Sequence, residues 1–266
     1  MTTLNRPKKK KKPDWPDWTF ETIGVLRSAY KDKFGIPRQS GMTPEAKGWI
    51  ELDPHPFFAQ ACKDLDRFSH LWIVFVFHEH RSKSWKPSIR PPRLGGAKRV
   101  GVLASRSPHR PNPIGLSAVK LDRLELDHPD GPRIHVSGLD ILDGTPILDI
   151  KPYLPYADVI ESANSGWAEG PIPRTPVDYT DRALRDIEAR VPQVPNLKHM
   201  IQEILELDPR PASQRRKMPA DAEASEGLAF GFTIADYDVK WEIREKRFLV
   251  TEVVDLIDGK PPHQVK

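Results

Sequence analysis

The segment from residue 90 to residue 121 concentrates side chains that can bind anions. It holds seven arginines and lysines, five prolines and four glycines in 32 residues. Between two apolar runs lies the loop 105–113, which three prolines make stiff, so that ordering it on a ligand costs little entropy. Arginine is a fork-shaped donor that suits carboxylates and phosphates. Any one of these residues is compatible with a basic solvated turn, but their combination favours a loop that binds an anionic ligand.

Two other polar clusters follow apolar stretches. If the strand before them continues, His78 and His80 share one face and, with His109, form a possible set of metal ligands. No carboxylate follows at a familiar metal-binding spacing, so polar residues at a strand end are the simpler interpretation. The segment 143–146 (Asp-Gly-Thr-Pro) is typical of a turn, and an aspartate at a strand end is equally suited to binding a ribose or an ammonium group.

Familiar nucleotide-binding and catalytic motifs are missing. The sequence has no glycine-rich dinucleotide fingerprint, no P-loop, no Cys-x-x-Cys pair and no Gly-x-Ser-x-Gly elbow. The one cysteine, Cys62, falls on the apolar side of a predicted helix with Phe58 and Leu65, which favours a buried structural thiol over a nucleophile.

The charge balance is mildly basic, with 41 Lys and Arg against 37 Asp and Glu, for a net charge of +4. Five of the lysines form the run 8–12, and we expect residues 1–17 to be a disordered basic tail able to contact nucleic acid non-specifically. No apolar segment follows that run as in a secretory signal, and no stretch approaches the roughly 20 apolar residues that span a bilayer. We therefore expect a soluble intracellular protein with no membrane partner.

The elements that must position these residues are mostly short strands, because 28 prolines interrupt the chain. The run 71–77 is apolar throughout and rich in β-branched and aromatic residues, which predicts a strand buried on both sides. Regularly spaced short strands predict an all-β domain over residues 18–160, a barrel or a sandwich, and not a doubly wound sheet. Its predicted strands lie at 20–27, 49–52, 71–77, 100–104, 114–121, 133–141 and 147–150, with one helix at 56–66.

A second, smaller domain is predicted after a Ser-, Gly- and Pro-containing linker at 161–176. Residues 181–191 and 197–207 have apolar side chains at helical spacing. Strands are predicted at 229–234, 237–243 and 248–253. The fold class is therefore mainly β, an all-β barrel or sandwich followed by a small α+β domain at 177–266.

Five segments together resemble the TrmO (TsaA, VirR-type) family of S-adenosylmethionine-dependent tRNA methyltransferases. They are FSHLWIVFVFHEH, RPPRLGG, SRSPHRPNPIGLS, LDILDGTPILDIKPYLPY and DPRPA. The resemblance implies a β-barrel methyltransferase unrelated to the Rossmann type, which agrees with the missing glycine fingerprint. It also implies methylation of the exocyclic nitrogen of threonylcarbamoyladenosine next to the anticodon, by a cytoplasmic homodimer whose cofactor site is completed across the dimer.

The same resemblance implies which residues contact S-adenosylmethionine. The matching positions are Pro37, Arg38, Gln39, His78, Glu79, Arg106, Leu116, Leu142, Asp143, Gly144 and Thr145. Glu79 departs from the pattern, since an amide such as Gln is expected there. A carboxylate at this position either binds the cofactor's positive charge more strongly or costs energy to desolvate.

The cofactor carries an activated sulfonium, so the protein's work is mainly binding and alignment. The acceptor nitrogen has a delocalised lone pair, and some group must take its proton. His78, Tyr153 and Asp208 are candidates between which the sequence does not choose.

Contacts to RNA are predicted from both domains. Arg90, Arg93, Arg110 and Arg210 suit phosphates or the threonyl carboxylate, and Asn112, between two prolines, suits a base edge. Asp208 and Arg210 would approach the RNA from the small domain. Two alternative classes remain: a metal-dependent β-barrel oxygenase built on His78 and His80, and an RNA-binding module without chemistry. The main interpretation predicts no bound metal.

Overall fold

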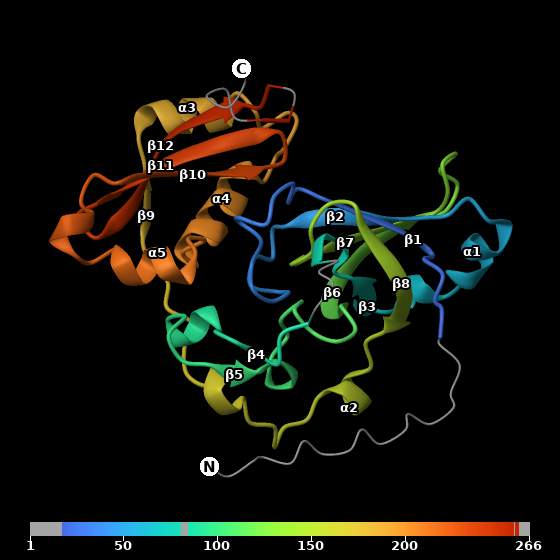
Figure 1. The fold of residues 1–266 in the computed structure, drawn as a ribbon. Coiled ribbons are helices and arrows are strands. Elements are labelled where there is room, and N and C mark those ends of the chain that lie inside the picture. The colour runs from blue at the N-terminus through green and yellow to red at the C-terminus, as the bar shows by residue number, and fades with distance from the viewer. Residues whose placement is uncertain (1–17, 81–84, 258, 261–266) are drawn as a thin grey trace, which may run out of the picture.

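The computed structural model describes residues 18–80, 85–257 and 259–260. Within these ranges the chain forms a closed barrel, drawn from blue to yellow-green in Figure 1, and a second sheet with helices, drawn in orange and red. The predicted tail at 1–17 lies outside the described residues. No helix in the described ranges is long and apolar enough to cross a membrane.

The barrel is built from six antiparallel strands in the order β1-β2-β7-β6-β3-β8. The strands are β1 (Gly24–Ser28), β2 (Lys47–Leu52), β3 (His70–Val76), β6 (Ile114–Glu125), β7 (Arg133–Ser137) and β8 (Thr145–Pro152). Alternate side chains of each strand point inward, as the two-residue period of a strand requires. Phe75 of β3 lies over Gly115 of β6, where a Cβ atom would approach the ring to 2.2 Å. Only glycine fits opposite this ring.

The expectation that residues 71–77 are buried on both sides is wrong. Leu71, Ile73 and Phe75 are buried, whereas alternate residues such as Trp72 are partly exposed on the outer wall. A closed barrel has one interior, so only one face of the strand enters the core. The outer face is covered in part by Tyr153, whose ring centroid lies 5.5 Å from that of Trp72.

Several predicted bounds also need correction. The predicted strand 20–27 begins only at Gly24, and the strand 133–141 ends at Ser137, although Leu139 and Ile141 remain buried beyond it. The predicted strand 100–104 is the two-residue β5 (Val100–Gly101), paired with β4 (Ser88–Ile89), followed by a 3-10 turn. The predicted helix 56–66 is α1 (Pro56–Ala61) plus a separate turn. The 3-10 turns of the chain are Leu65–Arg67, His78–His80, Pro92–Leu94, Val102–Ala104, Gly166–Ala168 and Glu223–Ser225, and a short helix α2 spans Pro155–Asp158.

The second part of the chain is a four-stranded sheet in the order β10-β11-β12-β9. Its strands are β9 (Val177–Tyr179), β10 (Ala229–Ile234), β11 (Tyr237–Arg244) and β12 (Arg247–Asp255), and its helices are α3 (Asp181–Glu188), α4 (Leu197–Glu206) and α5 (Ala212–Lys217). Five apolar residues of α4 are buried, as their spacing predicts. The helix expected at 181–191 ends three residues early, and α5 was not expected.

Backbone hydrogen bonds fix the small domain against the barrel. The amide of Ala235 donates to the carbonyl of Ala29 at 2.7 Å, and the amide of Glu45 donates to the carboxylate of Glu203 at 3.2 Å. Gly35, with φ of +97°, packs against the ring of Phe232, where a Cβ would come within 3.1 Å. The loop that carries the predicted residues 37–39 is therefore seated directly on the small domain.

Candidate functional site

The loop 105–113 is held in a compact shape at one end of β3 and β6. The Ser105 hydroxyl donates to the carbonyl of Val102 at 2.8 Å, and Arg110 Nη1 donates to the carbonyl of Ser105 at 3.0 Å. The amide of Phe77 donates to the carbonyl of Pro113 at 2.8 Å, which ties the loop to the end of β3. The prolines thus stiffen a loop that its own polar groups also close.

Two predicted cofactor segments meet at Arg106. Its Nη1 donates to Gln39 Oε1 at 2.6 Å, although 67 residues separate them, and Arg106 itself is exposed. Leu116, on the adjacent strand β6, is 52% exposed, which is unusual for a leucine in a barrel wall. Arg106 and Leu116 are thus both exposed, one on the loop 105–113 and one on the strand that follows it.

The third predicted segment, 142–145, is a turn bonded to the end of β1. Asp143 Oδ1 accepts from the amide of Ser28 at 2.9 Å, and Asp143 Oδ2 lies 2.9 Å from Lys31 Nζ. The buried Thr145 hydroxyl donates to the carbonyl of Leu142 at 2.7 Å. These contacts place the carboxylate at the start of the same loop that carries residues 37–39.

Sequence reasoning missed a partly buried polar pair whose carboxyl group interacts with the charge of Arg106. The Ser117 hydroxyl donates to Asp140 Oδ1 at 2.6 Å, and the backbone of Ser40 also hydrogen-bonds this carboxyl group. Burial raises the pKa of Asp140, while these hydrogen bonds and the charge of Arg106 oppose the shift. The one available signal was the position of Asp140 in the same resembling segment as Asp143.

Arg38 faces the small domain. Loss of solvent and the positive charge of Arg215 lower the pKa of Arg38 to about 10, with Asp208 opposing the shift. The group therefore remains cationic at neutral pH, and two cations from different domains share one neighbourhood. Such an arrangement suits an anion.

The three histidines do not form a metal site in the described part of the chain. The rings of His80 and His109 lie edge to face with centroids 5.0 Å apart, whereas His78 Nε2 lies 3.6 Å from Glu79 Oε1. Desolvation lowers the pKa of both His80 and His109. Among the described residues, no group of three or more His, Cys, Asp or Glu side chains is placed to hold a metal ion.

The predicted RNA contacts are in different situations. Arg90 and Asn112 are exposed. Arg93 donates to the carbonyls of Glu169 and Gly170 and so fastens the predicted linker to the barrel domain.

The guanidinium of Arg210 is not free to bind a phosphate or the threonyl carboxylate in the way that the sequence predicts. Its side chain is 3% exposed, and its guanidinium donates to both oxygens of Asp208, at 2.8 and 2.7 Å, and to the carbonyl of Met218 at 2.8 Å. All three guanidinium nitrogens are thus engaged inside the small domain, and the Asp208 carboxylate is neutralised. The physical reason is that the two residues lie two apart at the end of α4, where they pair with each other.

The residues present fit S-adenosylmethionine by chemistry. Arg106 suits the cofactor's carboxylate, Asp143 suits its ammonium group or ribose, and the exposed Leu116 offers an apolar surface to adenine.

Family models match both parts of the chain. A model of the tRNA-methyltransferase O N-terminal domain matches residues 25–159, and a model of the TrmO C-terminal domain matches residues 172–256. The chain belongs to the TrmO family. The TrmO relatives include a tRNA (adenine(37)-N6)-methyltransferase of Escherichia coli (strain K12), 41% identical over 87% of this chain and 95% of that protein. A putative S-adenosylmethionine-dependent methyltransferase of Pseudomonas aeruginosa is 39% identical over 82% of this chain and 90% of that protein.

Solved structures give the same result. A crystal structure of TrmO from Pseudomonas aeruginosa has a TM-score of 0.72 and 34% identity, covering 90% of this chain and 99% of that one. The comparisons confirm the family resemblance, the barrel fold and the enzyme class of an S-adenosylmethionine-dependent tRNA methyltransferase.

Proposed function

We propose that this TrmO-family chain transfers the methyl group of S-adenosylmethionine to the exocyclic nitrogen of threonylcarbamoyladenosine at tRNA position 37, next to the anticodon. The relative from Escherichia coli is a tRNA (adenine(37)-N6)-methyltransferase by name and is similar over 87% of this chain. The observation that carries the proposal is the Gln39–Arg106 hydrogen bond, because it joins two cofactor segments that are distant in sequence.

S-adenosylmethionine supplies an electrophilic methyl group, so the chain's residues act mainly by holding both reactants in line. Arg106, oriented by Gln39, binds the carboxylate of the cofactor. Asp143, held by the Ser28 amide and Lys31, faces its ammonium group or ribose. Pro37 and residues 142–145 complete the walls, while Glu79 lies 70% exposed at the rim.

The geometry favours His78 as the proton acceptor. Asp208 is fully engaged by Arg210. Tyr153 hydrogen-bonds through its amide to His70, at the start of β3, whereas His78 follows the end of that strand next to the loop 105–113. The seven-residue strand β3 therefore separates Tyr153 from His78 by roughly 20 Å, at a rise of about 3.3 Å per residue. His78 is therefore the candidate at the Arg106 end.

A homodimer and a cytoplasmic location belong to the same proposal. Large apolar side chains around the loop 105–113 are exposed, including Leu103 at 76% and Leu116 at 52%. Contiguous apolar surface on a monomer is typical of a protein–protein interface. A two-fold dimer through this surface brings a second copy to the cofactor residues.

The test is mass spectrometry of tRNA nucleosides after incubation with the protein and isotope-labelled S-adenosylmethionine. We expect label in methylated threonylcarbamoyladenosine, and none in tRNA prepared without the threonylcarbamoyl group. Absence of label from tRNA that carries threonylcarbamoyladenosine without the methyl group would contradict the proposal. Binding of RNA without any heat of S-adenosylmethionine binding would favour an RNA-binding module instead.

A further inference from the structure

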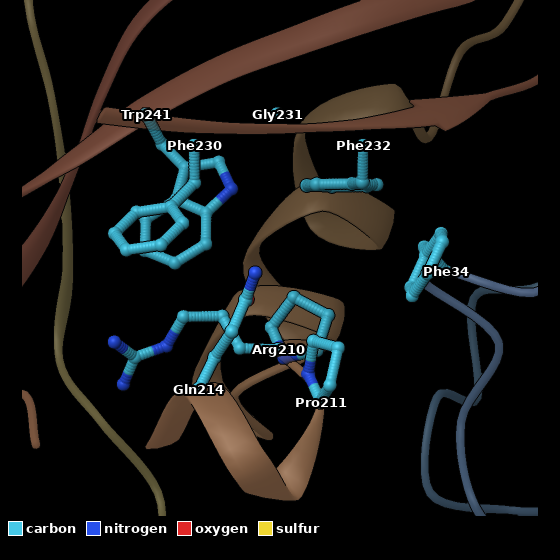
Figure 2. Close-up of a pocket in the computed structure, with 9 residues that line it drawn as sticks. Phe34, Arg210, Pro211, Gln214, Phe230, Gly231, Phe232 and Trp241 are labelled. Atoms are coloured by element: carbon cyan, nitrogen blue, oxygen red, sulfur yellow. The ribbon is translucent and has the colours of Figure 1, made fainter. Parts of the chain in front are cut away.

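A pocket at the junction of the two domains is separate from the cofactor residues. It lies between the loop that carries Phe34, the strands β10 and β11, and the start of α5 (Figure 2). The lining of this junction pocket includes Phe34, Arg210, Gln214, Phe230, Phe232 and Trp241. Its volume of about 240 Å³ is below the roughly 300–1,000 Å³ of clefts that bury drug-sized ligands, so it suits a single ring system.

The walls of the junction pocket are aromatic. Phe230 stacks on Trp241 with centroids 4.7 Å apart and planes 24° apart, and Phe232 is buried beside them. Phe34 stands opposite these rings on the barrel loop and is 41% exposed. Flat aromatic surfaces that flank a narrow space are suited to stacking a planar ligand.

Two polar groups give the pocket a hydrogen-bonding edge. In Figure 2 the indole nitrogen of Trp241 and the amide of Gln214 point toward each other from opposite sides. Trp241 is 2% exposed, and its Nε1 has no hydrogen-bond partner among the described residues. A buried N–H without an acceptor is costly, so an acceptor on a ligand would stabilise the complex. Nucleobases combine a flat face with acceptors on their edges.

The surroundings suit the backbone to which a nucleobase is attached. Gln214 is followed directly on α5 by Arg215, Arg216 and Lys217. Arg38 of the barrel approaches Arg215 closely enough for the two positive charges to oppose each other. Anionic phosphates relieve this repulsion.

We propose that the junction pocket binds one unstacked nucleobase of single-stranded RNA, with Phe34 closing over it and the cations of α5 contacting the adjacent phosphates. The proposal rests on the proposed action on tRNA, whose anticodon loop is single-stranded. Phe34 is five residues from Gln39, so a base in the pocket adjoins the loop that orients Arg106.

The experiment measures binding of anticodon stem–loop RNA at fixed salt by wild-type protein and by Phe34→Ala. Single abasic nucleotides replace each loop position in turn. Base–aromatic stacking predicts that Phe34→Ala weakens binding of intact RNA about tenfold. For wild-type protein, removing the base at one loop position should weaken RNA binding by a similar factor. For Phe34→Ala, removing the same base should cause no further loss of RNA affinity. Phe34→Trp should restore the affinity. Phe57→Ala is the matched control, because Phe57 is 69% exposed on α1, on the opposite side of the molecule from α5 (Figure 1).

The outcomes separate this proposal from the proposed function. If every abasic position lowers the RNA affinity of wild type and of Phe34→Ala by the same factor, no base is coupled to Phe34. The pocket assignment is then wrong, whether or not wild-type protein methylates tRNA. A loss of S-adenosylmethionine affinity in Phe34→Ala, with RNA binding unchanged, would assign the pocket to the cofactor site and also overturn it. Failure of wild-type methylation with the coupling intact would overturn only the proposed function.

Discussion

Replacing Arg210 by Met should destabilise the small domain rather than remove a phosphate contact. The guanidinium donates three hydrogen bonds of 2.7–2.8 Å, two to Asp208 and one to the carbonyl of Met218. It also lies 5.2 Å from the ring centroid of Phe230 and 5.3 Å from that of Phe248. Removing one partner of a buried ion pair leaves the other charge uncompensated, which costs about 3–5 kcal/mol of unfolding free energy.

Urea denaturation followed by circular dichroism measures this cost. The control is Arg244→Met, because Arg244 is 63% exposed and lies 3.7 Å from Glu242, a surface pair worth about 0–1 kcal/mol. Adding Asp208→Asn to Arg210→Met should recover part of the loss, since it removes the buried charge. A loss below about 1 kcal/mol for Arg210→Met would refute the reasoning from burial. So would a weaker salt dependence of RNA binding in folded variant protein, because that result requires a lost phosphate contact.

Four other variants test the site. Arg106→Ala should weaken S-adenosylmethionine binding about 10- to 150-fold without RNA, from the roughly 1.5–3 kcal/mol of a charged hydrogen bond, as calorimetry can measure. Arg110→Ala should leave that affinity nearly unchanged but raise the Michaelis constant for tRNA and flatten its salt dependence. The pKa of Asp140 is raised, so the folded state holds its proton to higher pH than the unfolded state does. The free energy of unfolding should therefore fall as the pH rises from about 4 through the raised pKa. Asp140→Asn should lack this decrease when denaturation is measured over a series of pH values. Leu116→Asp should shift sedimentation from dimer to monomer.

The arrangement of strands was largely readable from the sequence. Two-residue alternation, as in Val239, Trp241 and Ile243, located β11 within one residue, because one face of that sheet is buried. The apolar run 71–77 was misread as buried on both sides, since closure into a barrel is a property of all six strands and not of one. Val102 fits the apolar pattern of a strand but lies in a 3-10 turn. That turn is closed by a hydrogen bond from the Ser105 hydroxyl to the carbonyl of Val102, which hydrophobic periodicity cannot predict.

The site was predictable only in part. Gln39 and Arg106, two predicted cofactor residues far apart in sequence, are hydrogen-bonded, whereas Asp143 contacts Ser28 and Lys31. Arg210 was misassigned because a sequence shows charge but not burial, and its partner Asp208 is only two residues away. The junction pocket was invisible for a similar reason, since Phe34 and Trp241 are 207 residues apart and meet only through the packing of two domains.

The loop that begins after β1 connects the two candidate sites physically. Gly35 packs on Phe232 of the small domain, and four residues later Gln39 accepts a hydrogen bond from Arg106. Between them Arg38 lies in the field of Arg215. A ligand that moves Phe34 must therefore act on a short segment anchored at both ends, one end on the small domain and the other on the cofactor residue. If the junction pocket binds RNA as proposed, we expect RNA and cofactor binding to be coupled, and by linkage each ligand then changes the affinity for the other by the same factor.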